Sequence, residues 1–490
     1  MAEFDILVIG GGVNGAGIAR DAAGRGYSVL LCEREDLAQA TSSASSKLIH
    51  GGLRYLEQYQ FRLVREALRE REVLLRAAPH IVEPLRFVLP HSSVLRPGWL
   101  IRLGLALYDH LGGRERLPAS KRVALRGSPL GTPLSADAKF GFSYFDCRVD
   151  DSRLVVLNAI DALERGAQIR PRTAVTGMRW EGGEWRVSVR QAQSNHDQTV
   201  TARAVVNAAG PWVGDAVDGA VSKKIRLVKG SHITVPKLYE GEHAYILQNA
   251  DRRVIFVIPY LADQSLIGTT DTEYDGDPGK VCCSDDDVAY LCDAVNRWFD
   301  PGIGPDDVTW AYAGVRPLLD DGAGDAASVT RDYRLDMETA EGQGPLLTVV
   351  GGKITTYRKL SEQALDRLQP HLGGGKGRWT ADAVLPGGDI PGSDFPAFLT
   401  ETKRRHSWLP DELAERLARA YGSRIDRVLG TAVKLGDLGK KFGAGLFEAE
   451  VDYLKHHEWA ASADDILWRR SKLGLRFREA EIEQLQRWFD

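Results

Sequence analysis

The sequence is poor in cysteine, with five in 490 residues, and no two of them are spaced as a CxxC pair. An odd number without paired spacing argues against a disulfide framework and against a zinc ribbon. We therefore expect a reduced, intracellular protein that binds no metal. The five residues are Cys32, Cys147, Cys282, Cys283 and Cys292.

A long apolar run is also missing. Residues 99–111 come nearest, but Arg102 and Asp109 interrupt them, and a membrane-spanning helix needs about 18 apolar residues. The N-terminus lacks the basic region and the small-residue cleavage site of a signal peptide. We expect a cytoplasmic chain without a transmembrane helix, and peripheral attachment to a membrane stays open.

The chain carries little net charge, because 63 Lys and Arg stand against 67 Asp and Glu for a formal charge of −4. This balance argues against a dedicated nucleic-acid-binding protein. Hydrophobic residues make up 43% and charged residues 27%, which is ordinary for a globular protein. The length predicts about three domains.

The first 33 residues predict a βαβ unit. Residues 5–10 form a short apolar run typical of a buried parallel strand, and residues 28–33 form a second one. Residues 13–24, between them, are small and helical in character. Strand, glycine turn, helix and strand in this order are the parts of such a unit.

A glycine pattern follows the first of these strands. Gly10, Gly12 and Gly15 have the spacing GxGxxG at the start of the predicted helix. The first makes a tight turn, the second lets the backbone approach a pyrophosphate, and the third lets the helix pack closely on the strand. Glu33 ends the second strand, where a carboxylate can accept hydrogen bonds from a ribose. The motif predicts dinucleotide binding without separating NAD from FAD, and a glycine turn without a ligand is the alternative.

Two later glycine-terminated strands favour FAD. Residues 205–212 (VVNAAGPW) resemble the second flavin-associated strand of FAD oxidoreductases, and Gly351-Gly352 resembles their C-terminal flavin contact. Taken singly, each is equally well explained as an ordinary strand end. Together with the first motif they predict a nucleotide domain assembled from separate segments of the chain.

We predict an α/β fold, α+β overall, with three domains. Strand-like runs between residues 225 and 335, separated by Gly, Asp and Pro, indicate a mostly antiparallel sheet. The last hundred residues have a helical pattern with few β-branched runs. The predicted domains are a discontinuous Rossmann-like FAD-binding domain (1–75, 150–215 and 345–375), a substrate domain with a largely antiparallel sheet (76–149 and 216–344) and a C-terminal helical domain (380–490).

Longer blocks extend the pattern over almost the whole chain. They are 41–57 (TSSASSKLIHGGLRYLE), 229–236 (KGSHITVP), 256–260 (FVIPY), 267–274 (IGTTDTEY), 314–318 (GVRPL), 330–335 (TRDYRL), 351–360 (GGKITTYRKL), 385–390 (LPGGDI), 437–439 (DLG), 448–459 (EAEVDYLKHHEW) and 464–475 (DDILWRRSKLGL). In this order they closely resemble the FAD-dependent, membrane-associated glycerol-3-phosphate dehydrogenases, especially the aerobic bacterial type. The resemblance implies oxidation of sn-glycerol 3-phosphate to dihydroxyacetone phosphate, with hydride transfer from C2 to FAD. Electrons would then pass to ubiquinone or another membrane quinone.

The resemblance also implies an arginine clamp for the substrate phosphate. Arg316 and Arg331 would hold the phosphate, with Arg54 and Tyr55 nearby. A planar guanidinium suits this role because it binds phosphate oxygens in pairs. Any one of these arginines taken alone is better explained as a surface residue.

Other residues of the same blocks are expected to act on the C2 hydroxyl. His232 is the candidate general base, since a neutral imidazole can take the hydroxyl proton, and a core histidine is the alternative. Lys353 would stabilise negative charge on the flavin and orient the substrate oxygen, and a solvated lysine is the alternative. We take His50 as structural, because the family holds FAD noncovalently. The residues expected to contact FAD are Gly10, Gly12, Asn14, Gly15, Glu33, Ser45, Ser46, Lys47, Gly210, Gly351, Gly352 and Thr355.

A quinone-reducing enzyme without a transmembrane helix must reach the bilayer from its surface. Residues 94–130 carry seven basic residues and two acids among Trp99 and several leucines, a mixture that suits contact with anionic lipid. A basic helix packed on its own core is the alternative. We expect a peripheral protein on the cytoplasmic face of the inner membrane, with no nucleic-acid partner, and a homodimer as an open option.

Two other functions stay open. A flavin amine or hydroxy-acid oxidase would use oxygen and would need no phosphorylated substrate. The related oxidases carry a longer middle insertion that is absent here, which favours a dehydrogenase. A flavin-dependent nucleic-acid-binding protein would need a basic stripe, and the charges of the last hundred residues are balanced.

Overall fold

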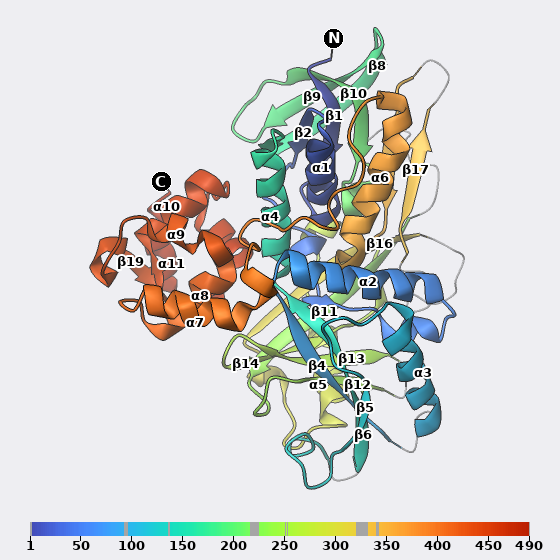
Figure 1. Cartoon of the computed structure of the whole chain (residues 1–490), viewed down its shortest axis with the longest axis vertical. Helices are drawn as coiled ribbons and strands as arrows, with labels where there is room; N and C mark the ends of the chain where they lie inside the picture. The colour runs from blue at the N-terminus through green and yellow to red at the C-terminus, as the bar shows by residue number, and fades with distance from the viewer. Residues whose placement is uncertain are drawn as a thin grey trace.

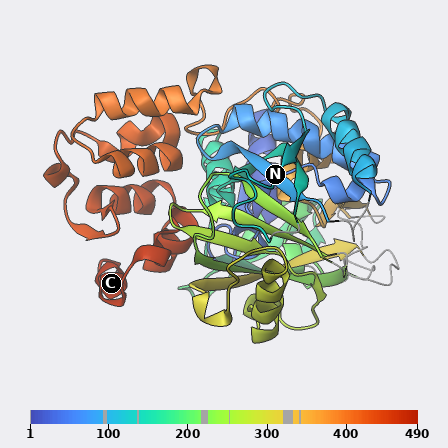
Figure 2. The same cartoon turned by 90° about the horizontal axis from the view of Figure 1, so that it is seen from below.

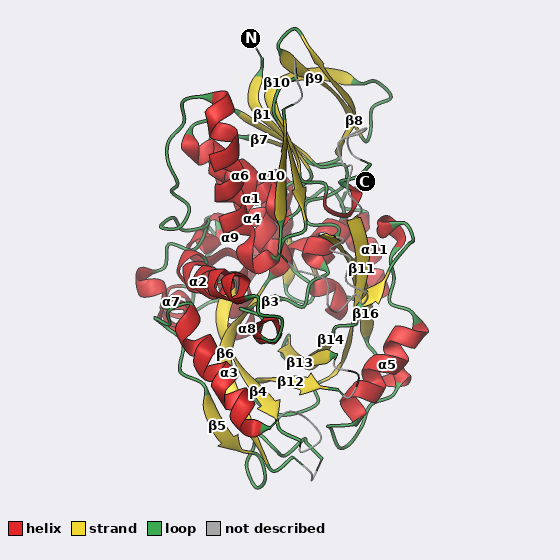
Figure 3. Ribbon diagram, turned by 90° about the vertical axis from the view of Figure 1, so that its right-hand side faces the viewer, coloured by secondary structure: helices red, strands yellow, loops and turns green. Residues whose placement is uncertain are grey.

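The computed structural model describes residues 2–92, 97–135, 138–215, 225–249, 251, 253–319, 332–339 and 343–489. Two large β-sheets form the framework of the molecule. In Figure 1 the first sheet lies at the top and the second at the bottom, with a helical domain to their left. Figure 3, which draws strands in yellow, separates the two sheets along the long axis of the molecule.

The first sheet has a parallel centre, as expected for continuous apolar strands that are buried on both faces. Helices α1, α4 and α6 pack beside one another on this sheet. Its strand order is β17 (Arg334–Glu338), β18 (Leu346–Val350), β10 (Gln198–Asn207), β1 (Phe4–Ile9), β2 (Val29–Cys32) and β7 (Gln168–Arg170), with β9 (Glu184–Gln191) on β10 and β8 (Thr173–Glu181) on β9. The helices are α1 (Val13–Arg25), α4 (Asp151–Glu164) and α6 (Tyr357–Leu372).

The second sheet is antiparallel at every described pair except β4 with β12, which confirms the predicted largely antiparallel sheet. Its order is β15 (Thr272–Glu273), β11 (Ile225–Pro236), β14 (Gln264–Gly268), β13 (Val254–Tyr260), β12 (Ala244–Gln248), β4 (Val82–Pro90), β6 (Phe140–Val149) and β3 (Leu48–Ile49), with β16 (Trp310–Leu319) on β11 and β5 (Lys121–Ala124) on β6. Its helices are α2 (Phe61–Ala77), α3 (Gly98–Leu111) and α5 (Asp285–Asn296).

The C-terminal residues form a helical domain with its own core. In α8 the buried residues recur at helical spacing, at 413, 414, 417, 418 and 421, so that one face packs inward. Figure 2 shows the domain, in orange and red, beside the two sheets. Its elements are α7 (Phe395–Arg405), α8 (Asp411–Tyr421), α9 (Ile425–Leu429), β19 (Lys441–Gly443), β20 (Leu446–Phe447), α10 (Glu448–His457), the π-helical turn η10 (Asp465–Arg470) and α11 (Glu479–Gln486).

The two sheets divide the chain slightly differently from the predicted domains. β17 lies within the predicted substrate segment 216–344 but pairs with β18 of the first sheet. β3 lies within the predicted nucleotide segment 1–75 but pairs with β6 of the second sheet. Both differences arise from long-range strand pairing, which the local apolar pattern does not encode.

Candidate active site

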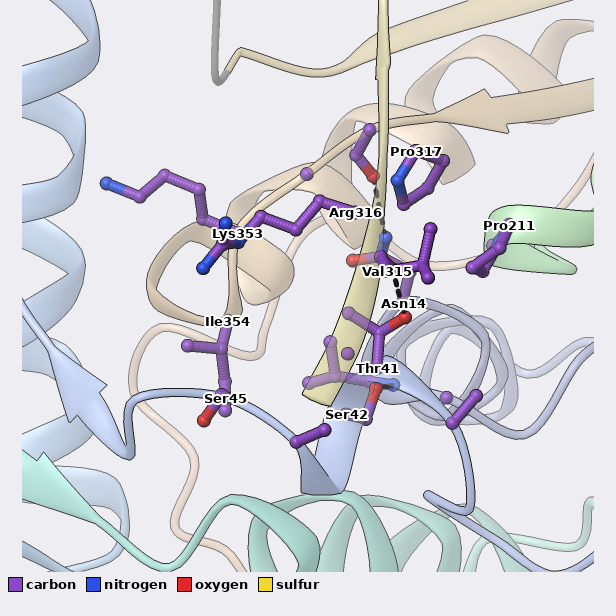
Figure 4. Close-up of a pocket in the computed structure, with 18 of the residues that line it drawn as sticks. Asn14, Thr41, Ser42, Ser45, Pro211, Val315, Arg316, Pro317, Lys353 and Ile354 are labelled. Carbon is purple, nitrogen blue, oxygen red and sulfur yellow. Dashed lines mark hydrogen bonds between the residues drawn. The ribbon is translucent and has the colours of Figure 1, made fainter. Parts of the chain in front are cut away.

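A cavity of about 750 Å³ is lined by residues of both sheets and of the loops that follow their strands. Its nucleotide side comprises the turn after β1, the end of β2 and the start of the loop at residue 41. Its charged side comprises Arg54, Asp271, Arg316 and Lys353. Figure 4 shows Arg316 extending from β16 toward Lys353, with Asn14 and the 41–45 loop beside them.

The glycine turn of the nucleotide side leaves no room for side chains. A Cβ on Gly15 would lie 1.9 Å from the Gly10 carbonyl oxygen, which confirms that this position needs close packing of α1 on β1. Gly10 has a φ of +106°, and its Cβ would lie 2.6 Å from the Ala208 carbonyl oxygen. The start of α1 at Val13 therefore faces the cavity with its N-terminal dipole, as a pyrophosphate requires.

Two polar side chains complete the nucleotide side. Glu33 accepts hydrogen bonds from the N–H groups of Gly11 at 2.6 Å and Glu35 at 2.8 Å, so its carboxylate is fixed at the cavity wall. Burial raises the pKa of Glu33, although these two N–H groups oppose the shift. Asn14 donates to the Gly351 carbonyl at 3.2 Å, while its buried Oδ1 has no partner among the described residues. A turn without side chains and an unsatisfied buried acceptor fit a bound dinucleotide.

The loop between η1 (Thr41–Ser43) and β3 forms one wall of the cavity. Ser45 and Ser46 line it, as predicted residues of a cofactor site would. Lys47 lies behind this wall, where its ammonium binds Asp151 at 2.9 Å and the Ser43 carbonyl at 3.0 Å. Thr355 is also buried behind the wall and accepts a hydrogen bond from the His50 N–H at 3.2 Å.

The charged side lines the cavity with three cations and one carboxylate, and two of the cations contact that carboxylate. Arg316 binds Asp271 Oδ1 at 2.7 Å, and Arg54 lies 3.6 Å from Asp271 Oδ2. The Lys353 ammonium lies 4.4 Å from the centre of the Tyr55 ring. Among the described residues that line this side of the cavity, cations outnumber carboxylates, which suits an anion. Arg331, the other predicted phosphate ligand, lies outside the described residues.

Two histidines lie near the charged side, but only His50 lines the cavity. Burial and the nearby cations Lys353 and Arg54 hold the pKa of His50 well below its ordinary value. His232 is buried behind Ser46, whose hydroxyl lies 2.8 Å from His232 Nε2. Burial and Arg316 likewise lower the pKa of His232, so both imidazoles are neutral at neutral pH.

Some residues on this wall were not singled out from the sequence. His50 was taken as structural, yet it faces the cavity next to Gly52 and Arg54. Asp271 lies in the block 267–274, but no sequence pattern predicts its ion pair with Arg316 of β16. Within the described ranges, no group of three or more His, Cys, Asp or Glu is placed to hold a metal ion.

Comparison with family models places two units along the chain. The model of the FAD dependent oxidoreductase family matches residues 5–358. The model of the C-terminal domain of alpha-glycerophosphate oxidase matches residues 379–490, which agrees with the helical domain.

The chain is also similar to characterised relatives over nearly its whole length. It is 56% identical over 476 residues to a glycerol-3-phosphate dehydrogenase of Pseudomonas aeruginosa, covering 96% of this chain and 92% of that protein. It is 52% identical over 493 residues to a D-erythritol 1-phosphate dehydrogenase of Brucella abortus, covering 99% and 97%. It is 49% identical over 492 residues to the aerobic glycerol-3-phosphate dehydrogenase of Escherichia coli, covering 100% and 97%.

A solved structure agrees with the fold over the whole chain. The glycerol-3-phosphate dehydrogenase from Bacillus halodurans, complexed with FAD, has a TM-score of 0.78 and 28% sequence identity. The match covers 100% of this chain and 89% of that chain.

Proposed function

We propose, since the chain belongs to the family of FAD-dependent oxidoreductases, that it oxidises sn-glycerol 3-phosphate to dihydroxyacetone phosphate. The observation that carries this proposal is the placement of Arg54, Arg316 and Lys353 on the wall of the same cavity as the glycine turn. FAD, when bound, supplies a hydride acceptor that can pass electrons on to a quinone. Gly10, Gly12 and Asn14 are the residues of this chain that would hold its diphosphate.

The cations of the charged side bind the substrate phosphate in this proposal. Arg316 projects a planar guanidinium into the cavity, and Asp271 fixes its orientation through a 2.7 Å contact. A phosphate that enters between Arg316 and Arg54 gains charge-assisted hydrogen bonds that a neutral alcohol does not make. The same clamp holds C2 in one place, which orients it for hydride transfer.

In this proposal His50 takes the C2 hydroxyl proton directly, because its side chain lines the cavity and is neutral. His232, the base expected from the sequence, reaches the cavity only through the Ser46 hydroxyl. Anaerobic stopped-flow reduction of the flavin in His50→Gln and His232→Gln separates the two roles. We expect the larger loss of rate in His50→Gln, by roughly a hundredfold. A larger loss in His232→Gln would instead assign the proton transfer to His232 with Ser46 as relay.

Anaerobic addition of glycerol 3-phosphate to the yellow holoenzyme tests the function itself. We expect the flavin absorbance to bleach with glycerol 3-phosphate and to persist with glycerol, which lacks the anion. Persistence with both compounds would contradict the proposal. Reoxidation of the bleached enzyme by a soluble quinone, faster than by oxygen, separates a dehydrogenase from an oxidase.

D-erythritol 1-phosphate is a second candidate substrate, because the chain is 52% identical to a D-erythritol 1-phosphate dehydrogenase. Both compounds are polyol phosphates and would use the same cations. The ratio of kcat/KM for the two compounds decides between them. A higher value for the four-carbon compound would change the substrate while leaving the clamp and the chemistry unchanged.

We further propose that the protein binds the cytoplasmic face of the inner membrane through α3. Trp99 is 69% exposed and Leu103 60%, and Leu100 and Leu107 extend the same exposed stripe. α3 lies at the outer edge of the second sheet in Figure 1, and its opposite face packs inward through Leu105 and Tyr108. No described helix has the length and apolarity to cross a bilayer.

Vesicle flotation tests this surface with a matched control. The double variant Trp99→Gln and Leu103→Gln should abolish binding to phosphatidylcholine–phosphatidylglycerol vesicles. These side chains supply the apolar area that would be buried in the membrane. Val433→Gln with Leu435→Gln, also exposed but in the helical domain, should bind like the wild type. Equal binding of all three proteins would place the membrane surface elsewhere.

A further inference from the structure

One short segment of the helical domain contacts the cavity wall from behind. This segment, residues 465–472, begins with η10 and ends at Lys472. We propose that it positions the 41–47 loop and His232, so that Trp468 and Lys472 are positioning residues for turnover at the cavity. The proposal rests on the function proposed above, because it concerns the efficiency of the same site.

The segment is anchored to the nucleotide domain by buried ion pairs. Arg469 binds Asp36 at 2.6 Å, and Arg470 binds both oxygens of Asp36 at 2.8 and 2.9 Å. Burial alone would raise the pKa of Asp36, but Arg470 and Arg469 outweigh it and lower the pKa. Asp36 lies between Glu35 and Gln39, which both line the cavity. The anchor is thus one residue away from the wall.

An aromatic stack leads from the same segment to the buried histidine. Trp468 stacks on Trp310 with ring centres 5.2 Å apart, and Trp310 packs on Tyr312 at 4.5 Å. Tyr312 stacks on His232 at 4.9 Å with an angle of 9° between the rings. His232 in turn contacts the cavity-lining Ser46 at 2.8 Å. The orientation of His232 therefore depends on a stack that begins in the helical domain.

A shared carboxylate gives the segment a second connection to the loop. Asp151, at the start of α4, accepts hydrogen bonds from Lys47 at 2.9 Å and from the Ser45 hydroxyl at 2.8 Å. The Lys472 ammonium lies 4.0 Å from the same carboxylate. Burial would raise the pKa of Asp151, but Lys47 and Lys472 outweigh it and lower the pKa.

Both connections end on the same loop from different directions. Tyr312 donates a hydrogen bond to the Ser45 carbonyl at 2.8 Å, and Asp151 holds the Ser45 hydroxyl. A loop held at both the backbone and the side chain of Ser45 keeps Ser46 at a fixed place on the wall. Removing Trp468 or Lys472 should loosen this loop without removing any group that contacts the ligand cavity.

The test compares Trp468→Ala with Trp468→Phe and with a control in the same domain. Trp488→Ala is the matched control, because Trp488 packs on Phe442 of the helical domain and lies outside segment 465–472. In Trp468→Ala we expect anaerobic flavin reduction by glycerol 3-phosphate to slow by roughly tenfold to a hundredfold. Trp468→Phe should restore most of the rate, while Trp488→Ala should lower Tm and leave the limiting rate unchanged. Equal slowing in Trp468→Ala and Trp488→Ala would overturn the proposal.

Hydrogen exchange of the holoenzyme gives a readout that needs no substrate. Amides of residues 41–49 should exchange faster in Trp468→Ala and in Lys472→Met than in the wild type or in Trp488→Ala. Unchanged exchange in this peptide would overturn the proposal even where the activity falls. If glycerol 3-phosphate fails to bleach the wild type, the proposed function fails, and the exchange result still decides whether the segment positions the loop.

Discussion

The two sides of the cavity are built in opposite ways. The nucleotide side uses mainly backbone geometry and one fixed carboxylate, from Gly10 to Glu33 of one βαβ unit, with the loop at residue 41 beside it. The charged side uses side chains from four separate segments of the chain, two of which, Arg54 and Arg316, meet at Asp271. A pyrophosphate can be held by N–H groups and a helix dipole, whereas a compact phosphate needs full charges. Local sequence therefore encodes the first side, and only the complete fold assembles the second.

The strongest way to break the nucleotide side is to fill its closest contact. In Gly15→Ala the added Cβ would lie 1.9 Å from the Gly10 carbonyl oxygen, so α1 must move away from β1. We expect the purified protein to contain almost no flavin, as measured by absorbance against protein concentration. Gly104→Ala, in α3 with open space at its Cβ, is the control and should retain its flavin. Normal flavin content in Gly15→Ala would show that the turn tolerates displacement.

The charged side should fail without loss of the nucleotide. Arg316→Ala removes a guanidinium that faces the substrate phosphate, a loss of about 2–4 kcal/mol, so KM for glycerol 3-phosphate should rise by roughly 30-fold to 1000-fold. Steady-state kinetics and flavin content, measured together, check both halves of this expectation. Arg316→Lys keeps the charge but not the planar fork of donors, so its KM should lie between those of the wild type and Arg316→Ala. A wild-type KM in Arg316→Ala would remove this residue from the clamp.

A milder substitution on the nucleotide side should weaken FAD binding without affecting the substrate. Glu33→Gln retains an oxygen to accept from Gly11 or Glu35 but loses the negative charge, worth about 1.5 kcal/mol for one charge-assisted hydrogen bond. We expect FAD to bind the apoprotein about tenfold more weakly. Quenching of flavin fluorescence measures this binding. KM for glycerol 3-phosphate at saturating FAD should stay unchanged, and a parallel rise would show that the two sides are coupled.

The smallest expected effect concerns the charge of Lys472, which lies near Asp151 behind the 41–47 loop. Burial, assisted by Lys47, lowers the pKa of Lys472 from 10.5 to about 8. Between these values the unfolded chain holds a proton that the folded chain has released, so the free energy of unfolding rises with pH, by at most about 1.4 kcal/mol per pH unit. In Lys472→Met this contribution should vanish. Urea unfolding at pH 8 and pH 10 measures it, and identical slopes in both proteins would contradict the lowered pKa.

The predictability of each part follows from how far apart its contacts lie in the sequence. The turn at Gly10, the helix after it and the place of Glu33 at the end of β2 are predictable from the sequence, because they lie within one βαβ unit. The helical domain was expected for the same reason, since apolar spacing of three and four residues marks α8. The contact of its Arg470 with Asp36 was not expected, because no local pattern connects residues so distant.

The positions of single side chains were harder to predict than the elements that carry them. Lys47 stands in the predicted cofactor loop, but its backbone is left-handed with a φ of +55°, and the side chain points to Asp151. The sequence favours His232 as the base and a structural role for His50. In the structure, however, His50 lines the cavity, and His232 lies behind the cavity-lining Ser46. A motif gives the loop to which a residue belongs, and packing decides the side on which it projects.

The strand order of the first sheet has a consequence for synthesis of the chain. β1 pairs with β2, which follows it closely in the chain, but its other edge pairs with Ala202–Asn207 of β10. At typical rates of translation this edge stays open for roughly 10–40 s. An unpaired strand edge that is apolar apart from Asp5 is a template for pairing with other chains. Truncated products that end before residue 198 are therefore expected to aggregate, whereas the complete chain closes the edge with its own strand.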